Sequence, residues 1–186
     1  PFWEINDAVR VQNGSIYACG YLPRHGVVFI NLPEGGEPIY PKAGFVEGNS
    51  IQILEGGENI TLLIQSLTTV IQKITPVGVP KWRTELEGST LSILGDWAFR
   101  PGTRMKDGGF LIASAHREGR QEFIQLSKIS PEGKVMMTEK YGPFEEAKAC
   151  FIHTTPDGGI RIMAYCRDAW DWNLHLIQTD AEGKIK

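Results

Sequence analysis

Cationic and aromatic side chains gather in four short stretches of this sequence. The stretches "LPRHG", "AHREGR" and "CRDAWDW" each place arginine near histidine or tryptophan, and "LGDWAFRPGTRMKDGG" adds two arginines and a tryptophan. Guanidinium groups form planar forks for carboxylate, sulfate or phosphate, and exposed tryptophan faces stack on sugars or cations. We therefore expect a site for an anionic or carbohydrate ligand, or for an acidic peptide. Its predicted residues are Arg24, His25, Trp97, Arg100, Arg104, His116, Arg117, Arg120, Arg167, Asp168, Trp170 and Trp172.

Most of these residue types also have ordinary structural roles. Arginine and histidine in loops are commonly solvated, and tryptophan often packs between sheets. His153 and His175 are expected to pack or to form hydrogen bonds rather than to bind a ligand.

Metal and cofactor chemistry is disfavoured. The sequence has no Cys-x-x-Cys pair and no two histidines at helical zinc spacing, so no metal or other cofactor is expected. Cys19, Cys150 and Cys166 each lie among strand-forming residues, and we expect them to behave as small buried hydrophobic side chains.

Composition and charge exclude several classes of protein. The 186 residues are 41% hydrophobic and 22% charged, as in a soluble globular domain. A net charge of -3 gives no general attraction to phosphate backbones, so no nucleic-acid partner is expected. No apolar stretch approaches the roughly 18 to 20 residues that span a bilayer, so no membrane span is expected.

The loops that carry the predicted site belong to a repeat. Polar turns with glycine at positions 14, 57, 109 and 159 each precede a short apolar run, and these glycines are 43, 52 and 50 residues apart. A second series, with glycine at positions 36, 78, 133 and 183, has spacings of 42, 55 and 50. A period of about 40 to 50 residues with several strand-like runs per unit predicts the blades of a β-propeller.

Each unit is expected to be a four-stranded antiparallel meander, because short β-branched runs alternate with glycine turns. The predicted fold is an all-β propeller of four such blades in a single domain, 1–186. The blades are approximately 7–42, 43–86, 97–140, and 147–186 plus 1–6. In this arrangement the acidic glycine turns lie on the face opposite the arginine loops.

The best-defined turns resemble those of a known group of repeats. Asp107-Gly108-Gly109 with Pro131-Glu132-Gly133-Lys134, and Asp157-Gly158-Gly159 with Asp180-Ala181-Glu182-Gly183, are similar to the bacterial β-propeller repeats of exported and cell-surface proteins. The first two units depart from this pattern. The resemblance implies an exported, periplasmic or cell-surface location, a structural role for the turn residues, and a function that the fold alone does not define.

Two functional interpretations follow. The first is a non-catalytic binding or scaffolding propeller with a protein or glycan ligand, since no nucleophile elbow, phosphate loop or dinucleotide fingerprint is present. The alternative is a carbohydrate-active enzyme of sialidase-like or lyase type, with Asp168 or Asp171 as a carboxylate beside an arginine clamp. The turns lack the Ser-x-Asp-x-Gly-x-Thr-Trp box of sialidases.

The chain ends on "QTDAEGKIK", at the expected start of an outer strand. We expect Phe2 to Ile5 to supply that strand beside Leu174 to Thr179 and so to close the ring, because a closed ring leaves no sheet edge unpaired. The competing expectation is a chain that forms part of a larger propeller or complex.

Overall fold

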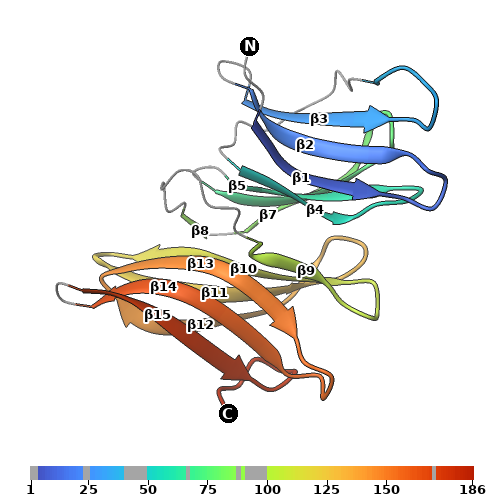
Figure 1. The fold of residues 1–186 in the computed structure, drawn as a ribbon. Coiled ribbons are helices and arrows are strands. Elements are labelled where there is room, and N and C mark those ends of the chain that lie inside the picture. Colours follow the sequence, from blue (N-terminus) through green and yellow to red (C-terminus); the bar gives the residue numbers. More distant parts are fainter. Residues whose placement is uncertain are drawn as a thin grey trace. The chain divides into compact units, whose positions relative to one another are not determined.

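The computed structural model describes residues 4–22, 26–39, 50–65, 68–86, 89–90, 100–168 and 171–186. These residues form fifteen β-strands in four sheets, and all pairs between named strands whose register is known are antiparallel (Figure 1). The all-β prediction is confirmed. None of the described segments forms a helix with the length and hydrophobicity that crossing a bilayer takes. The chain divides into two compact units, Pro1–Glu85 and Leu86–Lys186.

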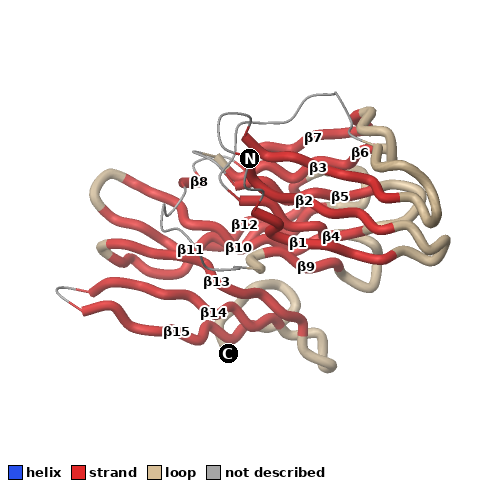
Figure 2. The backbone as a smooth tube through the Cα atoms, turned by 45° about the horizontal axis from the view of Figure 1, so that its top comes forward, coloured by secondary structure: helices blue, strands red, loops and turns tan. Residues whose placement is uncertain are grey.

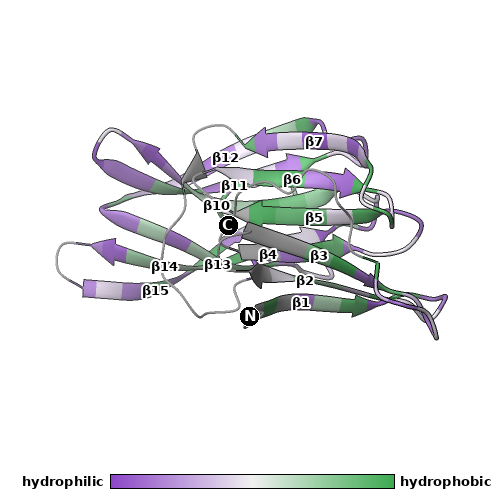
Figure 3. Cartoon of the chain, turned by 90° about the horizontal axis from the view of Figure 1, so that it is seen from above, coloured by the Kyte–Doolittle hydropathy of each residue, from purple (hydrophilic) through white to green (hydrophobic). Residues whose placement is uncertain are grey.

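The first unit contains two sheets. The sheet nearest the N-terminus has the order β1 (Glu4–Arg10), β2 (Ile16–Leu22), β3 (Gly26–Leu32). The next has the order β4 (Ser50–Glu55), β5 (Ile60–Gln65), β6 (Thr69–Ile74), β7 (Pro80–Leu86). β5 is hydrophobic over most of its length (Figure 3), and it packs against Tyr17 and Phe29 of the first sheet in one buried cluster.

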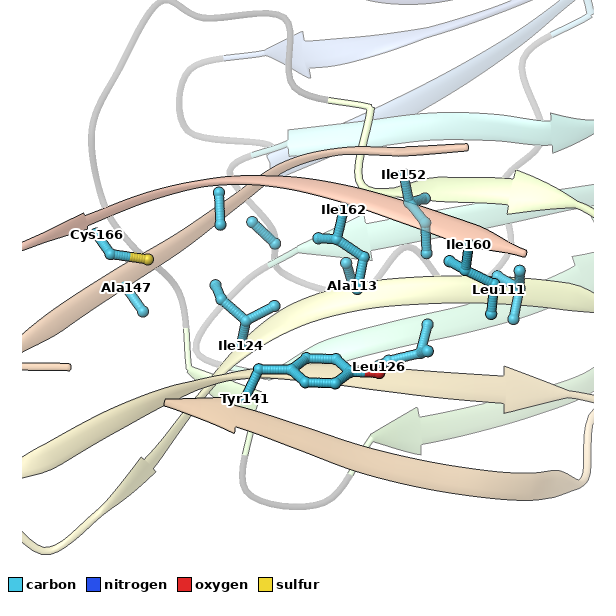
Figure 4. Close-up of a cluster of buried hydrophobic side chains, with 12 residues drawn as sticks. Leu111, Ala113, Ile124, Leu126, Tyr141, Ala147, Ile152, Ile160, Ile162 and Cys166 are labelled. Atoms are coloured by element: carbon cyan, nitrogen blue, oxygen red, sulfur yellow. The ribbon is translucent and has the colours of Figure 1, made fainter. Parts of the chain in front are cut away.

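The second unit also contains two sheets. One has β8 (Ser89–Thr90) and β9 (Gly102–Arg104) beside β10 (Phe110–Glu118), followed by β11 (Gln121–Ile129) and β12 (Val135–Phe144). The other has the order β13 (Glu146–Thr154), β14 (Ile160–Asp168), β15 (Asp171–Thr179). Apolar side chains from both sheets meet in one layer (Figure 4), because alternate residues of each strand point to the same side.

Six turns share one hydrogen-bond pattern, and they are among the tight connections in Figure 2. In the turn that begins at Met105, the N–H of Met105 donates to the carbonyl of Gly109 at 2.8 Å, and the N–H of Gly108 donates to the carbonyl of Met105 at 3.1 Å. The same pair of bonds recurs in the turns that begin at positions 11, 75, 130, 155 and 180. The fourth residue of all six turns is a glycine with positive φ, between 80° and 86°.

The two glycines of each Asp-Gly-Gly turn have different roles. Gly108 and Gly158 take the positive φ of 85°. Gly109 and Gly159 do not, but a Cβ built there would lie 2.6 Å and 2.8 Å from a backbone carbonyl oxygen on the neighbouring strand. The first glycine is therefore required by the turn, and the second by the close approach of two strands.

Each predicted repeat corresponds to one sheet, and two of these sheets have three strands among the described residues. In the first and fourth sheets the described residues show only isolated bridges at the position of the outer strand, Asn31 with Ile39 and Thr179 with Ile185. Whether the four sheets are blades of one domain stays a prediction.

The predicted closure of the ring is wrong. Ile5 pairs with Gly20 of β2, and β15 pairs with β14, so the sheets are not closed. The physical reason is that residues 4–10 form one continuous strand through a bulge after Ile5, whereas the prediction divided this run between two blades. Phe2 lies outside the described residues.

Candidate functional site

The strands of residues 86–186 bring several predicted site residues to one end. β10 runs from Phe110, beside the turn of Asp107, to Arg117 near its other end, and Arg120 lies in the turn to β11. β14 likewise runs from the turn of Asp157 to Arg167. The acidic glycine turns and these arginines therefore lie at opposite ends of the strands, as predicted for this part of the chain. We call the arginine-bearing end the loop end; its residues are Arg117, Arg120, Glu122, Glu146, Lys148, Arg167 and Trp172.

Arg117 is bound by a carboxylate of its own chain. Arg117 and Glu122 are direct partners across the β10–β11 hairpin, and Arg117 Nε donates to Glu122 Oε1 at 2.9 Å. A second bond joins Arg117 Nη2 to the same oxygen. Glu122 is buried, and its Oε2 accepts a 2.7 Å hydrogen bond from the backbone N–H of Ala147. Glu122 thus ties β11 to the start of β13.

Arg167 is also paired. It is the direct partner of Glu146 across β13 and β14, and Arg167 Nη2 lies 2.6 Å from Glu146 Oε1. Arg167 Nε lies 3.6 Å from Glu145 Oε2, and this buried atom makes no hydrogen bond to any described residue. One donor of this guanidinium therefore has no acceptor.

Lys148 is a residue that sequence reasoning missed. It is only 6% exposed, and its ammonium lies 4.2 Å from the centroid of the Trp172 ring. The Trp172 ring stacks on Tyr165, with centroids 5.0 Å apart and planes at 13°. Burial lowers the pKa of Lys148, and the nearby carboxylates of Glu146 and Glu122 oppose that shift. The short apolar context of "EAKACFIHT" gave no signal that this lysine faces an aromatic pair.

The ammonium of Lys148 lacks ordinary partners. Its side chain forms no hydrogen bond or ion pair with any residue that the structure describes, and its ammonium lies over the ring of Trp172. Lys148 is the direct partner of Tyr165, and Trp172 is the direct partner of Arg167, so all four side chains belong to one face of the sheet. An ammonium carries three donors, and here none has an acceptor.

The other described candidates near the loop end contact neighbouring side chains. Asp168 Oδ2 lies 3.6 Å from His175 Nε2, and the His175 ring meets the ring of Phe144 edge-on at 5.2 Å. His116 Nε2 lies 3.0 Å from Glu118 Oε1 and 2.9 Å from Lys140 Nζ. The ring contact of His175 fits the packing role expected of it, although its Nε2 is buried without a hydrogen bond to any described residue, whereas His116 was predicted to bind a ligand.

Two predicted residues lie elsewhere. Arg104 pairs with Phe110 at the beginning of β10, so it belongs to the acidic-turn end, and its assignment to the loop end was wrong. The reason is that β9 leads directly into the turn of Asp107. Arg100 forms a backbone bridge with Phe151 in the middle of β13 rather than at its end. Arg24, His25, Trp97 and Trp170 lie outside the described residues.

A hollow of about 490 Å³ lies at the acidic-turn end of the second unit. Met105, Met136 and Met137 line it, together with residues of three glycine turns. It contains no residue of the predicted site. In the part of the chain that the structure describes, no group of three or more metal-ligating side chains is found.

Comparisons with known proteins bear on the fold. No protein-family model matches the chain, and no curated protein does. Among solved structures, NanB with Optactamide aligns over 95% of this chain and 30% of its own, with a TM-score of 0.57 and 12% identity. A protein of unknown function from Bacteroides caccae aligns over 98% of this chain and 80% of its own, with a TM-score of 0.42 and 14% identity. The all-β fold thus resembles that of propeller-type proteins, and the chain spans 30% of the length of NanB.

Proposed function

We propose that this chain is a non-catalytic binding module that holds an anionic ligand at the loop end of residues 86–186. The observation that carries the proposal is Lys148, a residue only 6% exposed whose ammonium has no hydrogen-bond acceptor among the described residues. Burying an ammonium costs several kcal/mol unless a counter-charge and acceptors accompany it. A bound carboxylate or sulfate would supply the acceptors and would add to the counter-charge of Glu146 and Glu122.

The surroundings of Lys148 favour a ligand whose acidic group is attached to a ring or to another planar group. Arg167 Nε offers a second donor without an acceptor on the same face of the sheet. Tyr165 is 40% exposed beside the Trp172 stack, so a ring can lie against it while an acidic group reaches Lys148. Arg117 is the weaker candidate, because Glu122 already neutralises it. An acidic sugar or an acidic peptide satisfies these requirements.

The proposal also includes the fold and the location of the protein. The four sheets are proposed to be blades of a β-propeller, complete or part of a larger one, in an exported or cell-surface bacterial protein. Support comes from the six matching glycine turns and from the fold-level likeness to NanB. The alternative of a carbohydrate-active enzyme would assign a catalytic carboxylate to Asp168, which the proposal treats as a partner of His175.

Matched probes test the ligand. Glucuronate and glucose share a ring but differ in the carboxylate, and a tetraglutamate peptide represents the acidic-peptide case. We expect glucuronate or the peptide, but not glucose, to shift the indole resonance of Trp172. Lys148→Met should weaken this binding about tenfold or more, because a hydrogen bond to a charged group contributes about 1.5 to 3 kcal/mol. Arg161→Gln is the control, since it removes an exposed charge from β14 outside the loop end.

Two results would overturn the proposal. One is the absence of binding by both acidic probes, or binding that Lys148→Met leaves intact. The other is turnover of a fluorogenic glycoside that persists through purification and disappears in Asp168→Ala, because that result would identify an enzyme.

A further inference from the structure

Arg167 lies beside two consecutive acids that hold it differently. Arg167 Nη2 lies 2.6 Å from Glu146 Oε1, which is a hydrogen-bonding distance, whereas Arg167 Nε lies 3.6 Å from Glu145 Oε2, which is too far for a hydrogen bond. The Nε atom is nevertheless buried, and it has no acceptor among the described residues. Because Nε is buried, a ligand can reach it only if a neighbouring group moves away.

Glu145 is the acid that can move at low cost. Its side chain is 54% exposed, and exposed ion pairs contribute little to stability. Its backbone is fixed separately, since the N–H of Glu145 donates to the carbonyl of Arg167 at 3.0 Å. Glu122 has no such freedom, because its buried carboxylate accepts a hydrogen bond from the N–H of Ala147. The Glu145 carboxylate can therefore leave Arg167 without disturbing the strands on either side.

Lys148 and Arg167 can contact one ligand group. Lys148 stands opposite Tyr165, and Arg167 is two residues farther along β14 on the same face, so the two cations are diagonal neighbours. Long side chains at such positions are within reach of each other. Burial is the main cause of the lowered pKa of Lys148, and the nearby charge of Arg167 contributes to it. One carboxylate between the two side chains would give both of them an acceptor.

The number of charges around Lys148 favours replacement of an acid over simple addition of an anion. Lys148 and the ion pairs beside it contain as many cations as carboxylates, namely Arg117, Lys148 and Arg167 against Glu122, Glu145 and Glu146. An anion added to this set would leave an excess of negative charge. An anion that replaces the Glu145 carboxylate keeps the balance, because the charge of Glu145 is screened by water and salt once it turns into solvent.

We propose that Glu145 is the displaceable acid of this site, whose place at Arg167 Nε is taken by a ligand carboxylate that also contacts Lys148. This inference rests on the proposed function and deepens it by assigning a specificity-determining residue. A neutral ligand cannot replace the attraction between Glu145 and the guanidinium. Glu145 therefore excludes neutral ligands and admits anions.

Removing the charge of Glu145 tests the inference. Glucuronate and the tetraglutamate peptide are titrated into the unmodified chain and into Glu145→Gln, at low and at high ionic strength. We expect Glu145→Gln to bind these probes about threefold more tightly at low ionic strength, with a smaller gain at high ionic strength. Glu132→Gln is the matched control, because it removes an exposed glutamate charge from the acidic-turn end, and its affinity should equal that of the unmodified chain.

The Nε–H proton of Arg167 reports displacement directly. We expect its resonance to move downfield when glucuronate binds, because Nε–H then gains an acceptor. A gain in affinity in Glu145→Gln without this movement would overturn displacement and leave only repulsion between Glu145 and the probe.

Two further outcomes separate this inference from the proposed function. Binding that depends on Lys148 but is unchanged in Glu145→Gln, or is strengthened equally in Glu132→Gln, would overturn the role of Glu145 alone. Absence of binding by both probes would overturn the proposed function and this inference together.

Discussion

Replacing Glu122 tests whether one buried carboxylate holds the loop end together. Glu122 Oε2 accepts a 2.7 Å hydrogen bond from the N–H of Ala147, and Oε1 accepts one from Arg117 Nε at 2.9 Å. The Glu122 side chain is 8% exposed, whereas that of Arg117 is 56% exposed. The carboxylate therefore joins β11 of one sheet to β13 of the next. Its removal should separate the two sheets at this end.

The expected loss of folding stability follows from the hydrogen bonds that Ala147 and Arg117 would lose. Ala147 is fully buried, so its N–H would lose a charged acceptor without gaining water, which costs about 1 to 3 kcal/mol. Arg117 would regain water, so its loss is about 0 to 1 kcal/mol. Together these give about 1 to 4 kcal/mol for Glu122→Ala. Glu122→Gln keeps an acceptor for Ala147 and should cost about half as much.

Amide hydrogen exchange measures the effect where it occurs. The chain has two compact units, so a single global unfolding transition is not assured. We expect Glu122→Ala to lower the protection of amides in β13 and to leave residues 4–74 unchanged as an internal reference. Glu118→Ala is the matched control, because Glu118 is a neighbouring glutamate that is half exposed and contacts Lys140 and His116. Equal losses in the two variants, or a loss spread evenly over both units, would refute the reasoning.

The two glycines of one turn should respond differently to the same change. Gly158→Ala places a side chain at φ 85° and should cost about 1 to 2 kcal/mol, whereas Gly159→Ala drives a Cβ within 2.8 Å of a backbone carbonyl and should cost more, as thermal unfolding would show. Asn at position 158 should be tolerated better than Ala. Burial raises the pKa of Cys166 to about 12 from 9.0, so the folded chain keeps a proton that the unfolded chain loses. Stability should fall as the pH rises from about 9 toward 12, less steeply in Cys166→Ala, and native thiols should resist iodoacetamide at pH 8.

The regular parts of the fold could be predicted from local sequence. Glycine turns fix where strands end, and alternating apolar residues fix which face of a strand is buried, so the units containing Gly108 and Gly158 each match one sheet. The buried state of Cys19, Cys150 and Cys166 was also predicted correctly, because each lies among strand-forming residues. These features depend on neighbours within a few positions.

The errors concern partners that are distant in the sequence. Pairing of Ile5 with β2 or with β15 is decided by the free energy of whole sheets, which a run of six residues does not encode. Arg104 was assigned to the wrong end because the prediction treated the whole segment before Asp107 as one loop, whereas its last residues form β9.

Hairpin register decides which residue stands opposite each arginine of the candidate site, and the prediction from sequence did not take it into account. Arg117 stands opposite Glu122, and Arg167 stands opposite Glu146, so each arginine has a carboxylate as its direct cross-strand partner. Side chains in such pairs have Cβ atoms about 4.5 to 5.5 Å apart, which makes an internal ion pair the expected outcome once the hairpin register is known. An arginine cluster on hairpin loops is therefore weak evidence for an anion site until the opposite residues are identified.

The same rule distinguishes Lys148. Its direct cross-strand partner is Tyr165 rather than an acid, and the residue whose ring it contacts is Trp172, although the carboxylates of Glu146 and Glu122 are close enough to oppose the lowering of its pKa. Hairpin register thus separates Arg117 and Arg167, each opposite a carboxylate, from Lys148, which is opposite a tyrosine. For this reason binding should depend more strongly on Lys148 than on Arg117, although the arginine is far more exposed. Comparable losses of glucuronate or peptide binding in Lys148→Met and Arg117→Gln would contradict this division.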